Sequence, residues 1–133
     1  MLKLFIILLI VETNFNNTET IKSVELSYQT RGMQKCLYIT SDSVRITING
    51  KINGYKTNKS QWQSILKSFQ KVKLSGISKL KRPSTKSFYD GAMMTQLKVI
   101  TNLKEYESVG FDHDMPPSAL VKTINAMKVK ILE

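Results

Sequence analysis

A two-residue alternation of apolar and polar side chains constrains the fold of this chain more than any other feature. Val24, Leu26 and Tyr28 alternate with polar neighbours, and residues 44–48 repeat the pattern. Residues 35–40, which lie between them, are also strand-like. A period of two fits a strand with one buried face and does not fit an amphipathic helix. The sequence therefore predicts three consecutive strands.

Glycine-containing pairs separate these strands. Arg31-Gly32 follows the first strand, and Asn49-Gly50 and Asn53-Gly54 are both typical of two-residue hairpin turns. The short piece at residues 51–56 is predicted to be an edge strand.

An amphipathic helix is expected to follow the strands. Ser60 and Gln63 have the spacing of a capping box, in which each side chain bonds to the other residue's backbone N–H. Gly76 is predicted to end or bend this helix, and residues 75–87 to form a loop. The apolar residues at helical spacing are Trp62, Ile65, Leu66, Phe69 and Val72.

A second pair of strands and a last helix complete the pattern. Residues 93–99 alternate, residues 101–104 turn, and residues 105–111 return, so that pairing about Asn102 sets Met94 opposite Gly110. Pro116-Pro117 suit the start of a helix, and Asp114 complements its dipole. The apolar face of that helix comprises Leu120, Ile124, Met127 and Ile131.

The predicted order is thus β-β-β-α-β-β-α. It indicates an α+β fold with an antiparallel sheet of about five strands and two helices packed on one face. A chain of 133 residues fits one domain, which we place at residues 21–133.

Residues 1–20 are predicted to be a secretory leader. Lys3 precedes an apolar run from Leu4 to Val11, which matches the charged and apolar regions of a signal peptide. The run is shorter than the roughly 20 residues that span a bilayer, and no small-x-small cleavage site follows it. A buried first strand and an uncleaved anchor are the alternatives. Export would place the first residue of the mature chain between Asn14 and Ile21. The mature protein would then lie in the periplasm, on the envelope or outside the cell.

The single Cys36 cannot form an internal disulfide, so a buried, inert thiol is expected.

The net charge of +10 is concentrated in one segment. Residues 43–89 contain eleven basic and no acidic side chains, and such a concentration attracts polyanions. An acidic protein, a glycan or a membrane surface would fit. Nucleic acid fits less well, because only three arginines and no binding motif are present. A plain solvated face is the alternative. The residues predicted to contact a polyanion are Lys67, Lys71, Lys73, Lys79, Lys81, Arg82 and Lys86.

A second cluster combines carboxylates with the only histidine. The predicted hairpin brings Asp90 near Asp112, His113 and Asp114, a set that suits a ligand or ion site. Alternatively, Asp112 and Asp114 cap the final helix, and His113 is a surface or packing residue. No nucleophile motif, phosphate-binding loop or cofactor motif is present, so neither an enzyme nor a cofactor is predicted.

Several of these residues, together with the leader, resemble a group of small exported proteins of Bacteroidota-type bacteria. The resemblance covers about residues 22–132, and it implies export and a single compact domain but no particular activity. It is carried by Trp62, Pro83, Phe88, Asp90-Gly91-Ala92, residues 106–111, Asp112-His113, Pro116-Pro117 and Leu120.

We therefore expect an exported, monomeric binding module with a basic surface for an acidic partner. An intracellular nucleic-acid-binding protein, and a hydrolase that uses His113 with a carboxylate, are the alternatives.

Overall fold

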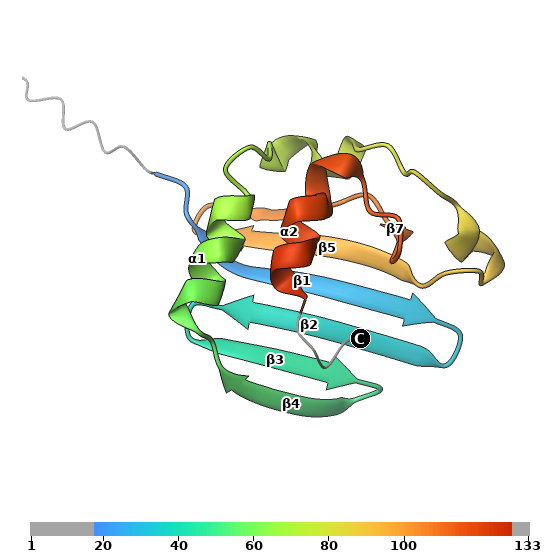
Figure 1. Ribbon diagram of the computed structural model, residues 1–133, viewed down its shortest axis with the longest axis horizontal. Helices are drawn as coiled ribbons and strands as arrows, with labels where there is room; N and C mark the ends of the chain where they lie inside the picture. Colours follow the sequence, from blue (N-terminus) through green and yellow to red (C-terminus); the bar gives the residue numbers. More distant parts are fainter. Residues whose placement is uncertain (1–17, 129–133) are drawn as a thin grey trace, which may run out of the picture.

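One antiparallel sheet with two helices on one face forms the body of the protein (Figure 1). The structure is a computed structural model and describes residues 18–128. The strands are β1 (Ile21–Thr30), β2 (Met33–Thr40), β3 (Ser43–Ile48), β4 (Lys51–Lys56), β5 (Met94–Thr101), β6 (Glu105–Glu107) and β7 (Phe111–Asp112). The α-helices are α1 (Lys59–Ser68) and α2 (Val121–Met127), and the 3₁₀ helices are η1 (Leu74–Lys79), η2 (Lys86–Tyr89) and η3 (Ser118–Leu120).

The sheet has the strand order β4-β3-β2-β1-β5-β6, and β7 also pairs with β5. The α+β class and the antiparallel sheet are confirmed, but the predicted number of strands is too low. The sheet contains seven strands, because residues 51–56 form a full strand and the returning strand divides into β6 and β7.

Of the three predicted turns that contain glycine, two form and one does not. Gly32 turns the chain from β1 to β2 at φ 78°, and Asn49 and Gly50 turn it from β3 to β4 at φ 48° and 84°. Positive φ at both central residues defines the type I′ turn, which suits asparagine followed by glycine. The turn predicted at Asn53-Gly54 is wrong, because both residues pair with β3 inside β4.

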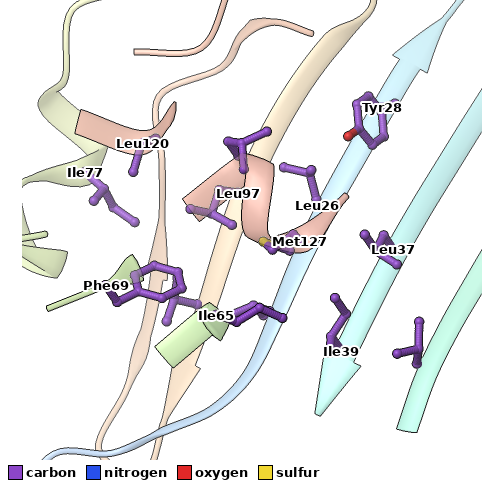
Figure 2. Packing of buried hydrophobic residues seen from close by; sticks show 14 of the residues in the cluster. Leu26, Tyr28, Leu37, Ile39, Ile65, Phe69, Ile77, Leu97, Leu120 and Met127 are labelled. Atoms are coloured by element: carbon purple, nitrogen blue, oxygen red, sulfur yellow. The ribbon is translucent and has the colours of Figure 1, made fainter. Parts of the chain in front are cut away.

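The core lies between the sheet and the two α-helices. Figure 2 shows Leu26 and Leu37 of the strands lying towards Ile65 and Phe69 of the first helix and Met127 of the second. All five side chains are buried. The alternation of β1 thus selects the helix-covered face, as predicted, and leaves Glu25 and Ser27 on the other face.

Helix α1 begins and ends earlier than predicted. Its N-cap is Asn58, whose Oδ1 accepts a hydrogen bond from the Ser60 N–H at 2.8 Å. The predicted capping box is therefore wrong, since Ser60 already lies inside the helix. The helix ends at Ser68, and Gly76 lies within η1 and does not end α1.

The last helix is short and follows a single 3₁₀ turn. Leu120, Ile124 and Met127 are buried, as the spacing predicts, and Ile131 lies outside the described residues. Pro117 precedes η3. The hydroxyl of Thr123 donates to the Ser68 carbonyl at 3.4 Å and joins the two α-helices.

The register of the second strand pair differs from the prediction. Met94 lies opposite Asp112, not Gly110. The Ser108 hydroxyl accepts the Leu97 N–H at 2.9 Å, and the Val109 N–H donates to Ile77 of η1 at 3.0 Å. The chain therefore leaves the sheet after β6 and rejoins it at β7. At Gly110 a Cβ would lie only 2.9 Å from the Met94 sulfur, so a side chain there would force this contact to shift.

The predicted leader at residues 1–20 lies mostly outside the described residues. Where the description begins, Asn102 in the β5–β6 turn accepts the Thr20 N–H at 2.7 Å and donates to the Thr18 carbonyl at 3.2 Å. Within residues 18–128, no helix has the length and apolar character needed to span a membrane.

Candidate functional site: a lysine-lined groove between the helices

Most of the excess positive charge is free of ion pairs. Of the eleven basic residues in 43–89, only Arg82 and Lys86 form ion pairs among the described residues. The other nine are all exposed. Their charges are therefore available to an external partner. These nine are Arg45, Lys51, Lys56, Lys59, Lys67, Lys71, Lys73, Lys79 and Lys81.

Two of these lysines border a groove where α1 and α2 lie side by side. The groove has a volume of about 440 Å³. Lys122 of α2 supplies a third ammonium group, and among residues 18–128 no carboxylate lines the groove. The lining residues are Ser64, Lys67, Ser68, Gln70, Lys71, Lys122 and Ala126.

Helical spacing explains why these side chains meet. Lys67 and Ser68 follow Ser64 by three and four residues, which places their side chains on one face of α1. Gln70 and Lys71 lie in the turn that follows the helix. Ile65 is buried against the sheet, so this polar stripe flanks the buried face. Lys122 and Ala126 are spaced by four residues on α2 and face the groove in the same way.

The groove offers positive charge together with neutral donors. Each lysine presents three rotatable N–H donors at one charged point, whereas arginine would present a planar fork. Ser64 and Gln70 add hydroxyl and amide groups. This set suits carboxylates or other anions whose orientation varies.

The structure divides the seven predicted polyanion contacts into three groups. Lys67 and Lys71 line the groove, while Lys73, Lys79 and Lys81 are exposed outside its lining. Arg82 and Lys86 are engaged by carboxylates. Lys122 is not among the residues predicted to contact a polyanion. It lies far from Lys67 and Lys71 along the chain, and only the packing of α2 on α1 brings it to the groove.

The four residues of the predicted Asp/His cluster do not bind one common group, although Asp112 and Asp114 both contact Lys86. Asp90, at φ 59° after η2, forms an exposed ion pair with Arg31 at 3.1 Å. Asp114 lies 3.7 Å from the Lys86 ammonium. The His113 ring accepts the Met93 N–H on Nδ1 at 3.0 Å, and the backbone N–H of His113 donates to the Met93 carbonyl at 3.0 Å. Within residues 18–128, no three histidine, cysteine or acidic side chains come close enough to hold a metal ion.

Asp112 has a structural environment. Its fully buried carboxylate accepts the Lys86 N–H at 2.9 Å and the Ser87 N–H at 3.0 Å, and it pairs with the Arg82 guanidinium at 3.2 Å. Arg82 in turn stacks on the Phe88 ring at 4.3 Å from the centroid. Asp112 thereby fixes residues 82–88 against β7.

The hydrogen bonds also set the charge of Asp112. Burial alone would raise the pKa of this carboxyl, but bonds from the Ser84 and Ser87 hydroxyls and from the backbone N–H groups of Ser87 and Lys86 outweigh burial. They hold the pKa well below its usual range. The group is therefore ionised at neutral pH, with its bonding capacity directed to the protein itself.

Cys36 is a half-buried free thiol on the sheet face opposite the helices. Burial, reinforced by the nearby Glu25 carboxylate, raises the pKa of the thiol to about 11. A protonated thiol is a poor nucleophile, which agrees with the predicted inert role.

Comparisons with known proteins add no family assignment. No family model, no curated protein and no solved structure matches the chain.

Proposed function

We propose that the protein is a binding module that holds an acidic partner in the groove between α1 and α2. The observation that carries this proposal is that Lys67, Lys71 and Lys122 surround one groove, to whose lining the described part of the chain contributes no carboxylate. A concentration of like charge raises the local potential and increases the rate of encounter with anions.

The chemistry of the lining favours an acidic protein segment over nucleic acid. All three cationic groups are lysines, and no arginine lines the groove to form bidentate contacts with phosphate. The neutral donors and the small Ala126 suit a chain that carries carboxylates at irregular spacing.

Export forms a second part of the proposal. The charged and apolar pattern of residues 1–11 supports it. The acidic partner would then be a protein of the periplasm, the envelope or the exterior.

The proposed groove is tested by comparing two triple variants that remove the same charge. Lys67→Gln/Lys71→Gln/Lys122→Gln changes the groove, and Lys22→Gln/Lys59→Gln/Lys104→Gln changes three exposed lysines that border neither the groove nor strand β4. Because one exposed ion pair contributes about 0.2–1 kcal/mol, the groove variant should bind poly-L-glutamate about tenfold more weakly. The control variant should keep most of the affinity.

Two outcomes would overturn the proposal. Equal losses in both triple variants would show that net charge alone attracts the polymer. Tighter binding of duplex DNA than of poly-L-glutamate, with a steep salt dependence, would favour the nucleic-acid function.

A further inference from the structure

Within the described residues 18–128, strand β4 is a free edge of the sheet. It lies last in the strand order, and all six of its residues are exposed. Figure 1 shows β4 at the border of the sheet, with neither α1 nor α2 lying over it. An uncovered edge presents unpaired backbone groups to which another strand can bond.

The pairing of β4 with β3 identifies those groups. The Thr57 N–H donates to the Asp42 carbonyl at 3.1 Å, directly beyond the strand pair. Bonded and non-bonded pairs alternate in an antiparallel ladder, so residues 51, 53 and 55 bond to β3. The N–H and C=O groups of Ile52, Gly54 and Lys56 therefore point to the free edge.

A hollow of about 450 Å³ lies beside this edge. Gly54 contributes no side chain to it, and a Cβ there would lie 3.3 Å from the Val44 carbonyl oxygen. Tyr38 and Ile52 supply apolar surface, and the Arg45 guanidinium stacks 4.8 Å from the centroid of the Tyr38 ring. The hollow can therefore take one apolar side chain from a strand laid along the edge.

The charges of β4 identify the kind of strand that fits. Lys51 and Lys56 stand at its two ends, and Arg45 and Lys56 border the hollow. A second β4 strand would place lysine opposite lysine in either orientation, and like charges directly opposite are destabilising. The chain's own acidic strand β6 is a poor occupant, because η1 packs along it and Ile77 holds the Val109 N–H.

We propose that β4 binds an extended segment of a partner protein, with an acidic residue at each end and an apolar residue opposite Gly54, as an added strand of the sheet. In this recognition mode, main-chain hydrogen bonds give affinity and a pocket for one side chain gives specificity. The site is separate from the lysine-lined groove and does not depend on it.

The test uses capped peptides of the same length as β4. The peptide Asp-Thr-Val-Val-Thr-Asp places a valine opposite Gly54 and an aspartate opposite each lysine in either orientation. We expect it to bind at least about tenfold more tightly than the same peptide with lysine at both ends. N-methylation of the two valines removes backbone donors and should abolish binding without any change to the protein.

Protein variants distinguish this site from the groove. Ile52→Pro removes an N–H that faces the free edge, adds no new Cβ and leaves the bonds to β3 intact, so it should abolish peptide binding while the protein stays folded. Gly54→Pro removes a second such N–H but places a Cβ 3.3 Å from the Val44 carbonyl oxygen, so circular dichroism checks the fold of both variants. The groove variant Lys67→Gln/Lys71→Gln/Lys122→Gln should bind the peptide with the affinity of the wild type, whether or not its affinity for poly-L-glutamate has fallen.

Three results would overturn the inference: no binding of the acidic peptide, equal binding of the lysine-ended peptide, or binding that survives N-methylation. Concentration-dependent oligomers that Ile52→Pro abolishes would also overturn it, because a second copy of the chain would then occupy the edge.

Discussion

At the scale of single residues, Asp112 shows how a carboxylate can be fixed by its surroundings. It lies in a two-residue strand, yet it anchors the segment from Arg82 to Ser87 through two backbone N–H groups and one guanidinium. Removing one partner of a buried charged cluster leaves the others unpaired, which is strongly destabilising.

Asp112→Asn should lower the melting temperature at pH 7 more than Asp114→Asn, whose carboxylate is exposed. The sign of the pH dependence follows from the lowered folded-state pKa of Asp112. Its contribution is fully present above the unfolded pKa of about 3.9 and is lost as the pH falls towards the folded value. The difference between wild type and Asp112→Asn should therefore shrink below about pH 4. Equal melting temperatures of Asp112→Asn and Asp114→Asn at pH 7 would contradict the stabilising role of Asp112.

Cys36 should react slowly in the folded protein. With its pKa raised to about 11, the thiolate fraction at pH 8 is about a hundredfold smaller than for an ordinary thiol. Iodoacetamide labelling followed by mass spectrometry should be at least that much slower in buffer than in denaturant. Similar rates in the two solutions would show that the thiol is not protected.

At the scale of elements, the start of α1 shows two nearby residues of similar N-cap propensity, Asn58 and Ser60, only one of which is the N-cap. Asparagine and serine are both good N-caps, and the helix begins after Asn58. Asn58→Ala should destabilise the protein by about 1 kcal/mol and Ser60→Ala by clearly less. Urea unfolding of both variants measures the difference. A larger loss of unfolding free energy in Ser60→Ala than in Asn58→Ala would contradict the Asn58 cap and favour the capping box that the sequence predicts.

The elements show which parts of the fold local patterns can predict. Alternation identifies β1 to β3 because one face of each strand is buried, and Asn49-Gly50 identifies its turn because few other pairs accept positive φ twice. The division of β6 from β7 has no local signal. It depends on the Ser108 hydroxyl, which takes the Leu97 N–H, and on Ile77, which takes the Val109 N–H.

The same limit applies to the candidate site. Lys67 and Lys71 can be predicted, because both belong to the basic segment 43–89 that is visible in the sequence. Lys122 cannot, since only tertiary packing of α2 places it beside them. The prediction of the Asp/His cluster depends on a register that the structure does not have. Asp112 and Asp114 both contact Lys86, whereas Asp90 pairs with Arg31 and His113 bonds to Met93.

At the scale of the whole molecule, the excess positive charge belongs to one continuous segment of the chain. Residues 43–89 supply β4, α1 and η1 with exposed cationic groups and no acidic ones. The proposed groove and the β4 edge both draw on this segment, at two separate places.

Export of the protein predicts a shorter native chain. If residues 1–20 contain a leader, intact-mass analysis of the protein from its native cells should show the loss of about 12 to 20 residues. The Thr18–Thr20 contacts with Asn102 lie at the far end of this window, so cleavage before Thr18 would leave them intact. A native mass equal to the full chain would contradict cleavage and favour an anchor or an intracellular protein.

Mapping bound poly-L-glutamate by NMR chemical shifts tests the central claim most directly. We expect the largest changes at residues 64–71 and 122–126, where the two helices border the groove, and small changes at His113 and along β5. Changes spread evenly over every exposed lysine, or centred away from both helices, would contradict the account.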